Sequence, residues 1–349
     1  MIRFFCPCGA ELFFESEFCG ACKSPVAYNP EAMRFEIVQP PDETAANTTK
    51  TAVLCRNGVD FNVCNWLADH DAPHGLCFSC QFNRTIPNLG RDKNIQRWHT
   101  MEKSKRRLLF SLQSLGIPLA NGWRDPQGGL LFDFLEDARS NPMAESPFVT
   151  TGYLDGVVTI NVLEADPALR FAEQQASNQE YRTVLGHFRH ESGHHAYQLF
   201  AHDNELISSF AELFGDAHRD YGLALQSFHT MGPRDGWEQH HITAYASAHP
   251  SEDWAETWGH YLHIHDTLET AASFGLLESD STRPDFATKI HTWRRLSVGF
   301  NELNRSMGLD DAYPFIVNSA VAAKLAFVDH VIGALRNSSP DLATALPPF

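Results

Sequence analysis

Long apolar runs are missing from this chain, and cysteine is missing after residue 80. No stretch approaches the roughly 20 apolar residues that a membrane-spanning helix needs. The first ten residues, MIRFFCPCGA, lack the apolar core and cleavage site of a secretory signal peptide. These absences argue against a membrane or secreted protein. We therefore expect a cytoplasmic chain without a membrane partner, whose thiols stay reduced.

Basic residues are also scarce, with 27 Lys and Arg against 43 Asp and Glu and a formal net charge of −16. Phosphate backbones would repel such a chain, so we expect no nucleic-acid partner. One stretch runs against the trend, because residues 91–107 carry seven basic and two acidic side chains. The simplest interpretation is a helix whose cations are solvated or paired with the acidic body. A docking surface for an acidic partner is the alternative.

All eight cysteines precede residue 81 and form two groups of four. The C-x-x-C pairs have the ligand spacing of zinc ribbons, in which a tetrahedral metal replaces a core too small to be stable alone. The C-x-C pair at residues 6–8 is one residue shorter than that spacing, and an even cysteine count also permits disulfides. Reduced thiols favour two structural zinc sites. The expected ligands are Cys6, Cys8, Cys19 and Cys22 at one site and Cys55, Cys64, Cys77 and Cys80 at the other.

Residues 190–194 read H-E-x-x-H within a predicted helix, Tyr181–Phe200. His190 and His194 lie four residues apart, so both imidazoles point to one side and can bind a single Zn²⁺. Glu191 would reach the metal-activated water as the general base. A β-branched run at residues 156–162 predicts a strand before this helix, which could pair along its edge with an extended peptide. The pattern predicts hydrolysis of peptide bonds in a peptide or protein substrate.

A catalytic zinc site needs a third protein ligand and one open position. Pro250 and Ser251 predict a helix start, followed by Glu252 and Glu256 on one face. We assign Glu252 to the metal and Glu256 to the ring N–H of a ligand histidine, where a carboxylate fixes the tautomer. The reverse assignment is open, because the two residues share an i, i+4 face.

Four stretches resemble the zinc-binding metallopeptidases that carry N-terminal zinc ribbons: LCFSCQFNRTIPNLG, YRTVLGHFRHESGHH, LFGDAHRDY and AYASAHPSEDWAETWGHYLHIHDTLETA. The resemblance implies gluzincin-like peptidase chemistry and names no substrate. The segment EDWAETW is also similar to the third-ligand helix of lethal-factor-like peptidases and Pro-Pro endopeptidases, which carry a catalytic tyrosine seven residues before the ligand. Tyr245 stands seven before Glu252, so this likeness implies that its hydroxyl stabilises the oxyanion.

Other residues are weaker candidates. His187 lies one turn before His190, but a fourth protein ligand would close the site, so we expect a hydrogen-bonded histidine there. His260 shares a face with the two glutamates. Asp216 and Asp220 resemble the third ligand of deuterolysin-like peptidases, although the spacing does not match that motif. They remain the alternative ligand set.

The fold expected from these patterns is α+β, with zinc ribbons before a mainly helical, zincin-like domain that holds a small sheet. Residues 1–90 would form the tandem ribbons, at about 1–30 and 53–90, joined by a polar linker at 39–50. Residues 91–349 would form the peptidase domain. Its expected elements are a strand near 157–162 and helices near 92–115, 205–229, 251–272, 286–305 and 315–336, besides the helix with the motif.

Three functions fit the sequence. The first is a zinc peptidase with one catalytic and two structural Zn²⁺ ions. The second is a catalytically silent module that retains the fold and binds a protein partner through its ribbons, but a silent site has no use for Glu191. The third is a zinc-ribbon nucleic-acid protein, which the net charge disfavours. Cleavage specificity, endo- or exopeptidase action, oligomeric state and the role of the ribbons cannot be read from residue spacing.

Overall fold

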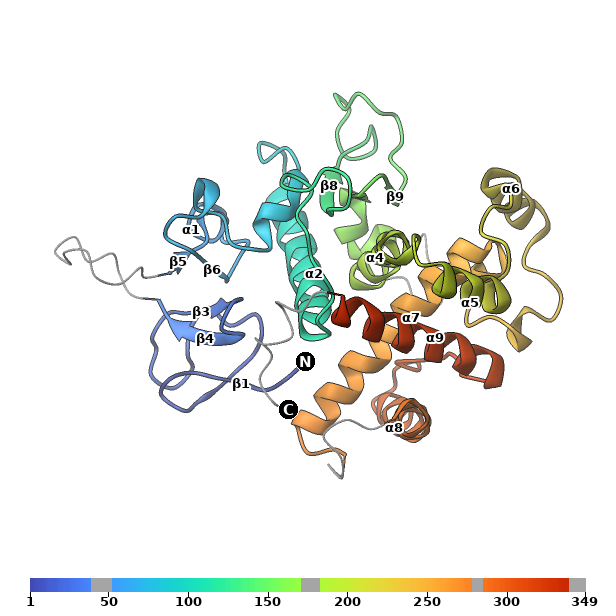
Figure 1. The fold of residues 1–349 in the computed structure, drawn as a ribbon. Coiled ribbons are helices and arrows are strands. Elements are labelled where there is room, and N and C mark those ends of the chain that lie inside the picture. Colours follow the sequence, from blue (N-terminus) through green and yellow to red (C-terminus); the bar gives the residue numbers. More distant parts are fainter. Residues whose placement is uncertain (39–51, 171–182, 278–284, 339–349) are drawn as a thin grey trace. The chain divides into compact units, whose positions relative to one another are not determined.

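The computed structural model describes residues 1–38, 52–170, 183–277 and 285–338 (Figure 1). The polar linker predicted at 39–50 lies outside the described residues, as do the first two residues of the helix predicted from Tyr181. The chain divides into two compact units, each described separately. The N-terminal unit contains Met1–Phe110 and Leu119–Glu173, and the second contains Ser111–Pro118 and Gln174–Phe349.

The ribbon region of the N-terminal unit consists of short antiparallel pairs around an aromatic core. Strand β1 (Phe4–Phe5) pairs with β2 (Glu11–Leu12), β3 (Val26–Asn29) with β4 (Arg34–Ile37), and β5 (Val53–Leu54) with β6 (Leu67–Ala68). Helix α1 (Arg56–Phe61) lies between the last two strands in sequence. The rings of Phe4, Phe14, Tyr28, Trp66 and Phe110 pack with centroids 4.9–6.1 Å apart. Aromatic packing thus gives these short strands a shared core.

A four-stranded sheet completes the N-terminal unit, with strand order β7 (Asn83–Thr85), β8 (Leu131–Leu135), β10 (Val157–Asn161) and β9 (Gly152–Leu154). The strand predicted near 157–162 is β10, but the expectation that it pairs with a peptide along its edge is wrong. It is parallel to β8 along its whole length and antiparallel to β9 over residues 157–159, so it is an inner strand of the sheet. The edges of this sheet are β7 and β9.

Helix α2 (Asn94–Ser114) contains most of the basic stretch, and two of its cations are not solvated. Lys105 and Arg106 are buried. Lys105 Nζ donates a hydrogen bond of 2.9 Å to Glu102, and Arg106 Nη1 donates one of 2.7 Å to the carbonyl oxygen of Val63. A long basic side chain is buried at low cost only when its donors are satisfied in this way.

The regular secondary structure in the described part of the second unit is all helical (Figure 1), and α7 (Pro250–Ser273) is in contact with most of the helices. The others are α4 (Val184–Phe200), α5 (Asn204–Phe214), α6 (Tyr221–Met231), α8 (Phe286–Ser306) and α9 (Ser319–Asn337). Helix α4 packs most extensively on α7, and α5 and α9 also contact it. The rings of Phe200, Phe210, Phe214 and Phe327 surround the indole of Trp254, which is fully buried.

Two predicted helix boundaries are wrong for identifiable local reasons. The helix predicted over 205–229 is two helices, because Gly215 follows α5 with φ +98°, a conformation that favours glycine. The helix predicted from residue 315 begins at Ser319, because the side chain of Asn318 caps it by accepting a hydrogen bond from the Val321 N–H. The expected class is confirmed, since small sheets and cysteine clusters precede a mainly helical domain. None of the described helices is long and apolar enough to cross a bilayer.

Candidate metal centre

The two helices of the candidate site, α4 and α7, approach closely at the middle of the H-E-x-x-H motif. A Cβ atom on Gly193 would lie only 2.9 Å from the Cα atom of Ala255. Trp254 Nε1 donates a hydrogen bond of 2.7 Å to the Gly193 carbonyl, and Trp258 Nε1 donates one of 3.0 Å to the hydroxyl of Ser192. Ser192 and Gly193, which separate Glu191 from His194 in the motif, therefore join the helices, and this contact brings the acidic start of α7 to the histidines.

His190 lies between two carboxylates, one at each ring nitrogen. Nδ1 is 2.6 Å from Glu256 Oε1, and Nε2 is 3.0 Å from Glu252 Oε2. His194 Nε2 is 3.6 Å from the other oxygen of Glu252. Two N/O ligands of a tetrahedral zinc lie roughly 3.4 Å apart, given metal–ligand distances of about 2.1 Å. The distances of 3.0 and 3.6 Å lie on either side of this value.

The charges of the site also suit a cation. A neutral imidazole has one ring proton, so donation from Nδ1 to Glu256 leaves a lone pair on Nε2 that faces Glu252. Such a contact is stable only with a proton or a metal ion between the two atoms. Burial alone would lower the pKa of His190, but its contacts with Glu252 and Glu256 outweigh burial and raise that pKa well above the usual range. The donor set therefore fits Zn²⁺, which would take the place of this proton.

The remaining groups of the site differ in how they titrate. Burial lowers the pKa of His194 to about 4, which keeps its imidazole neutral and able to bind a metal at neutral pH. Burial would raise the pKa of Glu252, but its contacts with His190 outweigh burial and bring that pKa to about 2. Glu191 is 7% exposed and lies with His190 and His194 in a group whose ligand atoms are all within 4.8 Å of one another.

Hydroxyl groups surround the two carboxylates. Thr243 donates a hydrogen bond of 2.7 Å to Glu256 Oε2. Tyr245 starts a 3₁₀ turn (Tyr245–Ser247), and its ring centroid is 6.0 Å from that of His190. Burial and then the charge of Glu252 raise the pKa of Tyr245, so its hydroxyl stays protonated. Tyr245 is thus close to the motif histidines.

Tyr221 is a site residue that the sequence reasoning missed. Its hydroxyl donates a hydrogen bond of 2.6 Å to Glu252 Oε1. Burial, followed by the charge of Glu252, raises the Tyr221 pKa. The only available signal was its place in LFGDAHRDY, a segment examined for its aspartates.

The weaker candidates have other interactions. Asp220 caps α6 by accepting a hydrogen bond from the Leu223 N–H, and Asp216 accepts one from the His218 N–H. His260 is buried, with Nδ1 2.8 Å from the hydroxyl of Tyr313. Within the described residues, the group of possible metal ligands formed by the motif consists of His190, Glu191 and His194, without His187.

A second polar group of α7 also contains possible metal ligands, namely His265, Asp266 and Glu269. Asp266 Oδ2 accepts hydrogen bonds from Arg189 Nη2 at 2.5 Å and from the Ser111 hydroxyl at 2.7 Å. The same oxygen cannot also bind a cation without giving up these donors. Asp266 thus forms an ion pair with Arg189 that joins α4 to α7.

The cysteines gather into the two predicted groups of four, and all eight, each within the described residues, are free thiols. The Sγ–Sγ distance is 3.7 Å between Cys6 and Cys22. It is 3.6 Å between Cys8 and Cys19 and also between Cys64 and Cys77. Sulfur ligands of a tetrahedral zinc lie roughly 3.8 Å apart, given Zn–S bonds of about 2.3 Å. Both groups fit zinc and neither forms disulfides.

The two cysteine groups differ in burial. Cys8 and Cys22 of the first are exposed, whereas all four thiols of the second are buried. Cys80 Sγ lies 3.8 Å from Glu102 Oε2 of α2, and the buried guanidinium of Arg106 interacts with the charge of Cys64. A zinc bound by four thiolates carries a net charge of −2, so a buried cation beside the second group offsets part of it.

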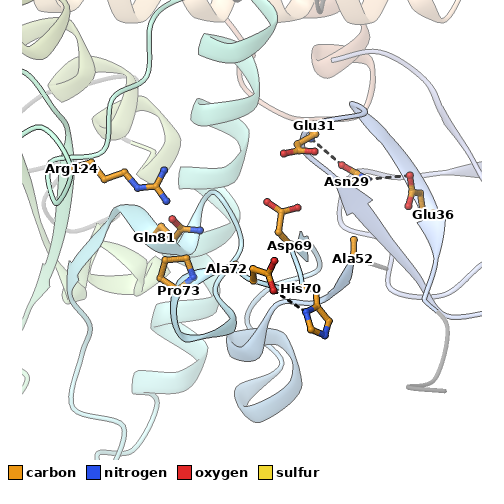
Figure 2. A pocket seen from close by; sticks show the side chains of 11 residues that line it. Asn29, Glu31, Glu36, Ala52, Asp69, His70, Ala72, Pro73, Gln81 and Arg124 are labelled. Atoms are coloured by element: carbon orange, nitrogen blue, oxygen red, sulfur yellow. Dashed lines mark hydrogen bonds and ion pairs between the residues drawn. The ribbon is translucent and has the colours of Figure 1, made fainter. Parts of the chain in front are cut away.

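The N-terminal unit also contains a polar cavity of about 480 Å³ (Figure 2). Its charged lining is mainly acidic, with Glu31, Glu36, Asp69 and Asp71 besides His70 and Arg124. No cysteine and no residue of the H-E-x-x-H motif is among its lining residues. The cavity is therefore separate from all the candidate metal sites.

The comparisons with known proteins agree with this geometry. Residues 94–331 match the family described as "Putative zinc-binding metallo-peptidase", and residues 3–91 match a zinc-ribbon domain. Uncharacterized proteins of Mycobacterium bovis and Mycobacterium tuberculosis are each 38% identical over 354 residues, with 99% of this chain and 98% of the relative covered. No solved structure matches the chain significantly. The resemblance inferred from the motifs is confirmed, and the chain belongs to this zinc-binding metallo-peptidase family, with a zinc-ribbon region before the peptidase region.

Proposed function

We propose that this protein is a zinc-dependent peptidase in which His190, His194 and Glu252 bind the catalytic metal and Glu191 is the general base. The observation that supports it most directly is the position of the Glu252 carboxylate, whose oxygens lie 3.0 and 3.6 Å from the two histidine Nε2 atoms. A carboxylate and two imidazoles leave one tetrahedral position open, as a catalytic zinc requires.

Bound Zn²⁺ would supply Lewis-acid chemistry, polarising the peptide carbonyl and lowering the pKa of the attacking water. Glu191 would take a proton from this water and deliver it to the leaving amine. The Tyr245 hydroxyl would donate a hydrogen bond to the oxyanion as it forms. Glu256, held by Thr243, would keep the proton of His190 on Nδ1 and so direct Nε2 to the metal.

The same proposal assigns residues 1–90 to a tandem zinc-ribbon region and residues 91–349 to the peptidase domain. The two groups of four cysteines would hold structural zinc, because their thiol spacing is tetrahedral and they form no disulfides. The ribbons would add stability and a surface for a protein partner. Family membership supports a peptide or protein substrate.

The decisive experiment measures turnover of a peptide library by the zinc-loaded protein. We expect activity to disappear after chelation, to return with Zn²⁺, and to be lost in Glu191→Gln while the zinc content stays unchanged. Glu302→Gln is the matched control, because it makes the same chemical change at an exposed site on α8. Full activity in Glu191→Gln would contradict the role of general base. No turnover by the zinc-loaded wild type would favour the catalytically silent module.

A further inference from the structure

We propose that Tyr221 is a positioning residue of the metal centre, which holds Glu252 Oε1 so that the carboxylate binds the metal through Oε2 alone. This inference rests on the proposed role of Glu252 as a ligand. It adds a residue from α6 to a centre that the motifs assign only to α4 and α7.

The first evidence is the contact itself. The Tyr221 hydroxyl lies 2.6 Å from Glu252 Oε1, which is 3.6 Å from His194 Nε2, whereas Oε2 faces His190 Nε2 at the shorter distance of 3.0 Å. The two oxygens of one carboxylate therefore have different partners. Glu252 is 1% exposed, and a buried oxygen that loses its donor is costly to leave unpaired.

The second evidence is that Tyr221 is held in place by the start of α7. Helix α6 begins at Tyr221 and has no buried residue, although Phe228 packs against Tyr245 with ring centroids 5.7 Å apart. The Tyr221 ring packs edge-on against His249, with centroids 5.2 Å apart. His249 is 2% exposed and caps α7, only three residues before Glu252.

The hydrogen bonds of His249 extend this connection. Its Nδ1 accepts a hydrogen bond of 3.1 Å from the Ser251 N–H, so in the neutral ring the proton is on Nε2. Nε2 lies 3.2 Å from the carbonyl oxygen of Arg219 and donates to it. This bond fixes the chain two residues before Tyr221 to the start of α7. The tyrosine and its carboxylate partner are therefore positioned by the same short segment.

The chemical consequence concerns the coordination number. A carboxylate that binds through both oxygens occupies two positions of the metal and reduces the room for water and substrate. A strong hydrogen bond to Oε1 favours binding through Oε2 alone. Without the hydroxyl, Oε1 is a buried oxygen without its donor, and its best remaining partner is the metal. Tyr221 thus keeps a position open.

The test uses Tyr221→Phe in the full-length protein, with Tyr261→Phe as a matched control. Tyr261 lies on α7, nine residues beyond Glu252. Its hydroxyl donates a hydrogen bond to Asp329, also of 2.6 Å. The exchangeable site is the proposed site of His190, His194 and Glu252. Its affinity for zinc is measured by competition with a chromophoric chelator. Loss of a partner that orients a ligand typically weakens metal binding by about 10–100-fold, and we expect a loss in this range for Tyr221→Phe only.

A second measurement reports on coordination. Co²⁺ is loaded at the exchangeable site while the cysteine sites keep zinc, and its visible absorption is recorded. We expect weaker bands in Tyr221→Phe than in the wild type and in Tyr261→Phe, because absorptivity falls as coordination rises above four. Unchanged affinity or an unchanged cobalt spectrum would overturn the inference. Tyr221 is 45% exposed, so the variant is expected to fold.

Glu252→Gln separates this inference from the proposed function. If Glu252→Gln keeps its full affinity for zinc at the exchangeable site, the ligand set itself is wrong. If Glu252→Gln loses the metal and Tyr221→Phe matches the wild type in both measurements, only the role of Tyr221 fails.

Discussion

Gly193→Ala tests whether the close approach of α4 and α7 builds the site. Within a helix, alanine is normally more stable than glycine by about 1 kcal/mol, so propensity alone predicts a gain. The structure predicts the opposite. An alanine Cβ would lie 2.9 Å from Ala255 Cα and 3.2 Å from two atoms of Trp258. The nearest atom belongs to the backbone, so relief requires the helices to separate.

The expected loss follows from these two opposing effects. Adding a methyl group to a well-packed interface costs typically about 1–3 kcal/mol, from which about 1 kcal/mol of helix propensity is subtracted. The net expectation is a loss of up to about 2 kcal/mol. For a domain of this size, each kcal/mol lowers the thermal midpoint by about 2–4 °C. The separation also moves Glu252 from His190 and His194, so zinc affinity at the exchangeable site falls with stability.

Two alanine controls isolate the clash from propensity. Gly299 lies in α8, and its Cβ would meet nothing within 4 Å, so Gly299→Ala shows the gain from propensity alone. Gly259 is on α7 beside α4, but its Cβ would meet His190 N at an ordinary 3.5 Å. Both variants should be at least as stable as the wild type by calorimetry. If Gly193→Ala gains as much as Gly299→Ala and keeps its zinc affinity, the packing argument is refuted.

Two further predictions concern the N-terminal unit. Asp137 is buried and accepts hydrogen bonds from Arg139, Asn161 and Val149, which outweigh burial and bring its pKa down to about 2, below its usual range. This folded-state pKa lies below the unfolded value, so the ionised group stabilises the fold above about pH 4 and its contribution is lost as pH falls through about 2. Asp137→Asn should cost about 1–2 kcal/mol at pH 7, measured by urea unfolding, after discounting for the half-exposed Arg139. A difference that does not shrink toward pH 2 would contradict this account. Cys77→Ser should remove one of three zinc equivalents by metal analysis, whereas Ser79→Ala, at an equally buried residue, should remove none. Three equivalents in Cys77→Ser would argue against a four-thiolate site.

Local patterns predicted most of the helices and the cysteine groups. Helical spacing puts both motif histidines on one face, and Pro250 with acidic neighbours predicts the start of α7. These features depend only on residues a few positions apart. The clustering of the thiols likewise follows from their spacing, which zinc ribbons share.

Features that depend on tertiary packing were harder to predict from the sequence. The sequence placed Glu252 and Glu256 on one face but left their order open. Which glutamate faces which nitrogen of His190 depends on where α7 crosses α4, and Gly193 sets that crossing. The hydrogen bond between Tyr221 and Glu252 could not be predicted from the sequence, because the two residues are 31 positions apart. No local periodicity links such distant positions.

The sheet shows the same limit. A β-branched run correctly predicted β10, but partner strands decide whether a strand is at an edge. Strand β9 has only three residues, Gly152–Leu154, and lacks a clear alternation of apolar and polar side chains. The sequence therefore contains no signal for strand β9, which pairs with one side of β10.

Helix α7 shows why the motif alone does not make the site. Buried polar contacts anchor it, with Asp253 to Lys324 and Asp266 to Arg189. Buried ion pairs add little net stability, because desolvation offsets their attraction, but they are satisfied in only one register. Metal ligands need positions accurate to about 0.5 Å, a tolerance that apolar packing alone does not guarantee. These contacts fix the rotation and depth of α7, and so the position of Glu252 relative to the two imidazoles.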